Sequence, residues 1–120
     1  MTQTIDAARA LDLLRQAVAQ DGYGPDYVYE SRNDDPRGEC VYVRGGYPSC
    51  VVGHALAIAG FPLSSLEQYD TADDSSARYL DEHFSVVTTE AAAVLEAAQR
   101  LQDKGKPWGE ALKAAEAVAR

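Results

Sequence analysis

The residues best suited to chemistry are a cysteine and a histidine one helical turn apart, Cys50 and His54. Residues at this spacing share one face of a helix. If Cys50 begins a helix, the free amide groups and the helix dipole favour its thiolate, which is the attacking form. The spacing therefore supports one hypothesis, a cysteine-dependent hydrolase or acyl transferase. Cys50 would be the nucleophile, His54 or His83 the base, and the amides near Ser49 and Cys50 the oxyanion donors.

The same two residues also fit a packed core. Residues 50–59 read Cys-Val-Val-Gly-His-Ala-Leu-Ala-Ile-Ala, which is apolar on nearly every side of a helix. Cysteine often serves as a small hydrophobe in such a helix, and a core histidine is common there. We favour this interpretation over catalysis, because a nucleophilic thiol has to be reachable from solvent.

A zinc site is the second chemical possibility, formed by Cys40, Cys50, His54 and His83. These residue types suit zinc, but structural sites bring paired ligands two to four residues apart, and the two cysteines are ten positions apart. We predict no metal and no cofactor, since no phosphate-binding or dinucleotide-binding glycine loop is present. A disulfide between Cys40 and Cys50 is sterically conceivable, but we expect reduced thiols in a cytoplasmic protein.

Tyrosines provide the main candidate binding surface. Tyr27, Tyr29, Tyr42 and Tyr47 lie within 21 positions of one another, and tyrosine offers a large apolar face with a polar tip. An equally simple interpretation is that they cover a helical core.

Charge narrows the class of partner. Eleven basic residues, scattered along the chain, stand against nineteen acidic residues, a net charge of −8. An acidic protein without a basic stripe repels phosphate backbones, so we expect no nucleic-acid binding. The leading hypothesis is a non-enzymatic module that binds another protein, with a homodimer as one form of it.

The elements that position these residues are mainly helices. Apolar spacing predicts helices at 4–21, 49–59, about 64–69, 77–84, 88–104 and 107–119, and strands at 26–30 and 39–43 joined as a hairpin. The expected N-caps are Thr4, Ser49, Ser64 and Thr88 or Thr89, and Gly105 is the expected stop of the 88–104 helix. Gly45-Gly46 is expected to break the second strand, and Val118 is expected to face inward. Gly53 inside the 49–59 helix indicates close approach of another backbone. The prediction is an α+β, mainly α fold with one short β-hairpin, in a single domain spanning 1–120. The sequence contains no apolar run of membrane-spanning length, so we expect no membrane contact and a cytoplasmic location.

Two segments carry a resemblance, residues 50–56 with the trailing Gly60, and residues 98–111. Together they resemble a family of small uncharacterised proteins of actinobacteria and their phages. The resemblance implies a phage-type or actinobacterial setting. Small acidic phage proteins commonly bind a host protein, regulate expression or block a defence system, and the resemblance implies such a role here without assigning any catalytic residue.

Overall fold

The computed structural model describes residues 4–20, 22–29, 42–44, 46–70 and 77–119. The helices in it are α1 (Ala7–Val18), α2 (Val51–Ile58), α3 (Leu63–Asp70), α4 (Leu80–His83), α5 (Thr89–Asp103) and α6 (Trp108–Ala119), with a 3-10 turn, η1 (Ala77–Tyr79), before α4. One pair of two-residue strands accompanies them, β1 (Val43–Arg44) and β2 (Tyr47–Pro48). The predicted fold class, mainly α with one short hairpin, is confirmed.

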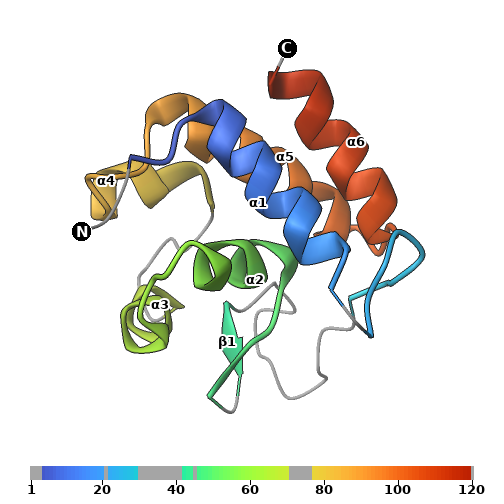
Figure 1. The fold of residues 1–120 in the computed structure, drawn as a ribbon, viewed down its shortest axis with the longest axis horizontal. Coiled ribbons are helices and arrows are strands. Elements are labelled where there is room, and N and C mark those ends of the chain that lie inside the picture. The colour runs from blue at the N-terminus through green and yellow to red at the C-terminus, as the bar shows by residue number, and fades with distance from the viewer. Residues whose placement is uncertain (1–3, 21, 30–41, 45, 71–76, 120) are drawn as a thin grey trace.

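The C-terminal helices α5 and α6 pack side by side, as their apolar stripes predicted (Figure 1). Thr88 begins α5 with its hydroxyl, which accepts a hydrogen bond from the Ala91 amide at 3.1 Å. Gly105 ends the turn after α5 with a φ of 82°, a conformation that glycine adopts without strain. The expected inward position of Val118 is wrong, because this side chain near the free end of α6 is 48% exposed.

Helix α1 lies against α2, α5 and α6 and buries Leu13 and Leu14 completely. Its start differs from the prediction, since Asp6 and not Thr4 caps it, with the Asp6 carboxylate accepting from the Arg9 amide at 2.8 Å. Asp6 is the N-cap because backbone hydrogen bonds tie Ile5 to residues 86 and 88 and keep the helix from starting earlier. The chain there is extended up to residue 6.

Helix α2 is buried from Val51 to Leu56. A Cβ built on Gly53 would overlap the carbonyl oxygen of Tyr42 and lie 3.0 Å from the Tyr42 Cα. The predicted close approach at Gly53 is thereby confirmed, and its partner is the backbone at Tyr42. The N-cap is Cys50 and not Ser49, and the Cys50 Sγ accepts from the Gly53 amide at 3.4 Å.

The hairpin lies further along the chain than predicted. Residue 30 of the first expected strand, 26–30, and residues 39–41 of the second, 39–43, lie outside the described residues. The described residues 26–29 form no strand, and of the described residues 42 and 43 only Val43 is in one. The observed pair is antiparallel, with Val43 opposite Pro48 and Arg44 opposite Tyr47. Gly46, expected with its neighbour at 45 to break a strand, lies instead in the turn between the two strands and has the positive φ, 81°, that such a turn requires.

Helix α3 also begins earlier than its expected Ser64 cap. The carbonyl of Pro62 accepts hydrogen bonds from the amides of Ser65 and Leu66 at 3.0 and 3.3 Å, so Leu63 is the first helical residue. Among the described residues, no helix combines the length and the apolar character needed to cross a bilayer.

Candidate functional site

Cys50 is enclosed at the start of α2. It is 0% exposed and disulfide-bonded. The expectation of a reduced thiol is therefore wrong for Cys50, because it rested on composition, which does not indicate which sulfur atoms meet in the fold. Cys40, the chain's other cysteine, lies outside the described residues. A buried, disulfide-bonded sulfur has neither the exposure nor the thiolate that nucleophilic attack requires.

His54 lies one turn further along α2, inside a cluster of aromatic rings. Its ring meets Tyr23 at a centroid distance of 4.7 Å and Trp108 at 5.6 Å, and Tyr23 stacks on Trp108 at 5.0 Å. His54 is 6% exposed, and neither of its ring nitrogens has a hydrogen-bond partner among the described residues. Burial lowers the pKa of the His54 imidazole, because the charged form loses its hydration.

The proposed catalytic set is not assembled around Cys50. The imidazole of His54 makes no hydrogen bond to the sulfur, although its backbone amide donates to the Cys50 carbonyl at 2.9 Å. His83 is exposed and packs its ring against Tyr69, at a centroid distance of 4.8 Å. Within the part of the chain that is described, no three His, Cys, Asp or Glu side chains gather closely enough to hold a metal ion.

The four candidate tyrosines do not share one exposed surface. Tyr42 and Tyr29 are core residues, 0% and 7% exposed, whereas Tyr47 on β2 is 75% exposed. Tyr27 is half-buried and packs edge-on against Trp108 at 4.6 Å. Burial raises the pKa of Tyr42 well above its ordinary value, and the Tyr42 hydroxyl accepts from Gln99 Nε2 at 2.9 Å. Tyr47 alone of the four keeps the exposure that a contact residue needs.

Two glutamines that the sequence interpretation overlooked hold the framework together. Gln102 Oε1 accepts from the Val51 amide at 2.8 Å and from Trp108 Nε1 at 3.0 Å. Gln99 Oε1 accepts from the Ala77 amide at 2.8 Å. Both glutamines are buried on α5. The sequence did contain a signal for them. Positions 99 and 102 follow Leu95 and Ala98 by four residues each, so they lie on the inward face of α5 although they are polar. Gln102 also joins the two segments that carry the resemblance.

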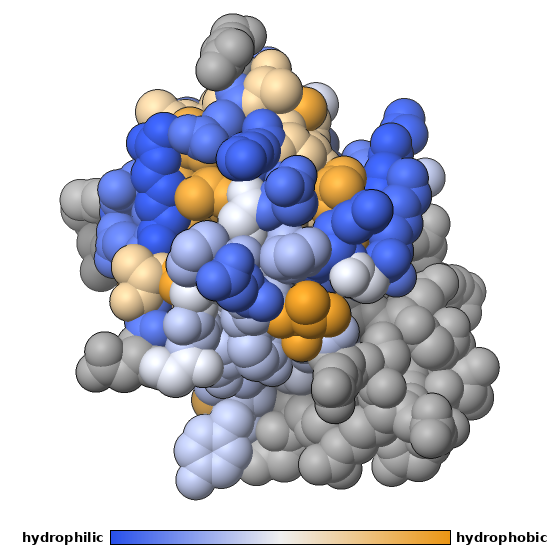
Figure 2. Space-filling view, turned by 90° about the vertical axis from the view of Figure 1, so that its right-hand side faces the viewer, coloured by the Kyte–Doolittle hydropathy of each residue, from blue (hydrophilic) through white to orange (hydrophobic). Residues whose placement is uncertain are grey.

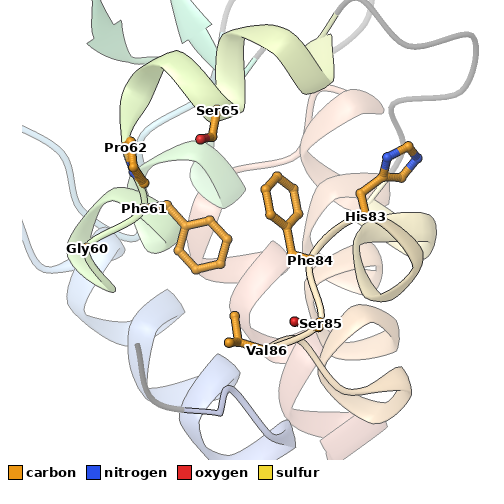
Figure 3. Close-up of a pocket in the computed structure, with 8 residues that line it drawn as sticks. All are labelled: Gly60, Phe61, Pro62, Ser65, His83, Phe84, Ser85 and Val86. Carbon is orange, nitrogen blue, oxygen red and sulfur yellow. The ribbon is translucent and has the colours of Figure 1, made fainter. Parts of the chain in front are cut away.

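An open groove lies between α3 and the segment that leaves α4. Its main hollow has a volume of about 290 Å³, and a second hollow of about 270 Å³ shares Ser65, His83 and Phe84 with it. Figure 3 shows Phe61 and Phe84 facing each other from opposite sides, with a ring-centroid distance of 5.1 Å. Tyr69 adds a third ring, 5.8 Å from Phe84. The groove therefore offers apolar, mainly aromatic walls beside polar groups of Ser65 and His83.

The walls of this groove are held by backbone hydrogen bonds. The Ile5 amide donates to the Val86 carbonyl at 2.7 Å, and the Thr88 amide donates to the Ile5 carbonyl at 3.0 Å. On the other side, the carboxylate of Asp70 at the end of α3 accepts from the amides of Tyr42 and Val43 at 2.9 and 3.2 Å. The groove is thus preformed, which lowers the ordering cost of binding.

Away from the groove, the exposed apolar side chains of the described residues are scattered. Figure 2 shows a face whose coloured residues are mostly hydrophilic, with the apolar ones in separate spots. Exposed large apolar side chains, such as Val28 at 41% and Val118 at 48%, are single residues. Scattered apolar residues are normal on a protein surface and carry no functional meaning.

Comparisons of the chain with protein-family models, curated proteins and solved structures found no match. The groove and the described residues around it are therefore the basis on which a function can be proposed.

Proposed function

We propose that this protein is a non-enzymatic interaction module that binds another protein through the groove between α3 and the 84–86 segment. The observation that carries the proposal is the open aromatic groove lined by Phe61, Phe84 and Tyr69. Apolar and aromatic pockets of this kind accept the anchor side chains that carry most of the binding energy at protein interfaces. The groove replaces the tyrosine face as the proposed binding surface, because Tyr29 and Tyr42 belong to the core.

The cysteine-hydrolase alternative has no comparable support. It needs a reachable thiolate at Cys50, and that sulfur is buried and disulfide-bonded. A phage-encoded protein acting on a host protein, as the resemblance implies, is our proposal for the biological role. The cytoplasmic location also stays a proposal, and the disulfide at Cys50 counts against it because disulfides persist mainly in oxidising compartments.

Two matched tryptophan variants on α3 test the proposed function. Ser65 lines both hollows of the groove, and Ser65→Trp fills them. Ser64 is its exposed neighbour and does not line either hollow, so Ser64→Trp is the control. We expect affinity capture from a native lysate, read by mass spectrometry, to give a partner that Ser65→Trp loses and Ser64→Trp keeps. A partner retained equally by both variants would exclude the groove, and one lost with Tyr47→Ala would move the site to β2.

A further inference from the structure

The acidic charge of the protein is concentrated in the stretch of sequence that contains the two helices flanking the groove, α3 and α4. Residues 61–90 contain seven acidic residues and one basic residue, so they carry a net charge of −6 out of −8 for the whole chain. This stretch includes α3, η1 and α4, and the lone basic residue is Arg78 on η1. The other 90 residues carry a net charge of only −2.

Three of these acidic residues, Glu67, Asp81 and Glu82, form no ion pair with the described residues. The ion pairs there join Arg9 with Asp12, Arg15 with Glu116, Arg100 with Glu96 and Lys113 with Glu110, all outside residues 61–90. Glu67 on α3 and Glu82 on α4 are exposed. Asp81 accepts a hydrogen bond from the Thr89 hydroxyl at 3.1 Å, which leaves its charge in place. The groove therefore lies in a region of negative potential.

We infer that the occupant of the groove is a basic segment of a partner protein, with at least one large apolar side chain that enters the main hollow and packs against the Phe61–Phe84 pair. The inference rests on the proposed function and adds the chemistry of the partner. The apolar anchor fits the aromatic walls, and Lys or Arg residues beside it complement the exposed Glu82, which precedes the lining residue His83. Charge complementarity of this kind speeds encounter and disfavours acidic competitors. A ring placed in the groove gains edge-to-face contacts, and a guanidinium can lie over the exposed part of the Phe84 ring.

The test is selection from a random 12-residue peptide display library on the purified, oxidised protein. We expect the enriched peptides to have a net positive charge and an aromatic or large aliphatic residue. Their binding should be lost with Ser65→Trp and kept with Ser64→Trp. Raising the salt concentration from 50 to 500 mM should lower the affinity of these peptides, because salt screens exposed charges.

Two double variants test how much of the peptide affinity comes from the acidic residues on α3 and α4. Glu67→Lys with Glu82→Lys changes the net charge by +4 on α3 and α4, the helices that flank the groove, whereas Asp26→Lys with Glu110→Lys makes the same change at exposed positions outside residues 61–90. We expect the first pair to lower the affinity of the selected peptides by about tenfold and the second pair to lower it by less than about threefold. Equal weakening by both pairs would mean that net charge alone attracts the peptides.

Other outcomes overturn the inference. The inference fails if the enriched peptides are neutral or acidic. It also fails if they bind the Ser65→Trp variant as well as the parent, or if the selection enriches no peptide. A protein that sediments alone as a dimer, and as a monomer after Ser65→Trp, would assign the groove to a second copy of this chain. If lysate capture gives a partner that needs the groove but docks an acidic segment, the proposed function holds and this inference fails. If neither experiment is sensitive to Ser65→Trp, both fail.

Discussion

Replacing Gln102 by methionine tests whether this buried amide holds α2, α5 and α6 together. Gln102 is 1% exposed, and its Oε1 is the shared acceptor for the Val51 amide and Trp108 Nε1. Methionine has a similar length and fills the same space, but its thioether is a weak acceptor. Both donors would remain buried without an adequate partner. Trp108 is itself 0% exposed, so water does not reach its indole in the folded state.

The magnitude follows from counting these donors. A buried donor left unpaired costs about 1–3 kcal/mol, so two donors predict a loss of about 2–6 kcal/mol in the free energy of unfolding. That is a large fraction of the about 5–15 kcal/mol that stabilises a typical domain. With a urea dependence of about 2 kcal/mol per molar, the unfolding midpoint should fall by about 1–3 M.

The assay is urea unfolding of the oxidised protein, followed by helical circular dichroism and by the fluorescence of Trp108, the chain's one tryptophan. Gln16→Met is the matched control, because Gln16 is exposed on α1 and bonds Asp12 at the surface, and it should change stability by less than about 0.5 kcal/mol. Trp108→Phe should cost about 1 kcal/mol less in the Gln102→Met background, where the indole donor is already unpaired. A midpoint for Gln102→Met within about 0.3 M of the parent would refute the reasoning.

Three further predictions use the same structure. Gly53→Ala should lower the free energy of unfolding by about 2 kcal/mol, despite a helix-propensity gain of about 1 kcal/mol, because the added methyl group overlaps the Tyr42 carbonyl; unchanged urea unfolding would contradict this. The lowered pKa of His54 means that the unfolded state binds the proton first, so stability should fall as the pH drops below about 6.5. His54→Phe should flatten this fall between pH 7.5 and 5, and His83→Gln should retain it. Cys50 should resist iodoacetamide even in denaturant until a reductant is added, whereas labelling of the unreduced protein would argue against the disulfide.

The helices could be predicted because their signals are local. The Thr88 cap and the Gly105 stop bound α5, and each acts through backbone atoms within a few residues. Gly53 also signalled its role, since glycine inside an apolar helix is costly unless a close contact requires it. The hairpin was misplaced because strand formation depends on contacts with residues distant in the sequence. Tyr27 and Tyr29 were expected in a strand. Instead, Tyr27 packs against the ring of Trp108, and the Tyr29 hydroxyl forms a hydrogen bond with that of Ser49.

The functional site could not be predicted because it is made by residues distant in the chain and individually ordinary. Phe61 ends the turn after α2 and Phe84 ends α4, and their spacing of 23 positions has no periodic meaning. Only the packing of α3 beside the 84–86 segment brings the two rings within 5.1 Å. The sequence by itself determined the helices and the concentration of negative charge in residues 61–90, because both depend on local order along the chain. The tertiary structure decided that Cys50 is enclosed, that Tyr29 and Tyr42 are buried, and that an aromatic groove lies beside those charges, because burial and contact depend on how the helices pack.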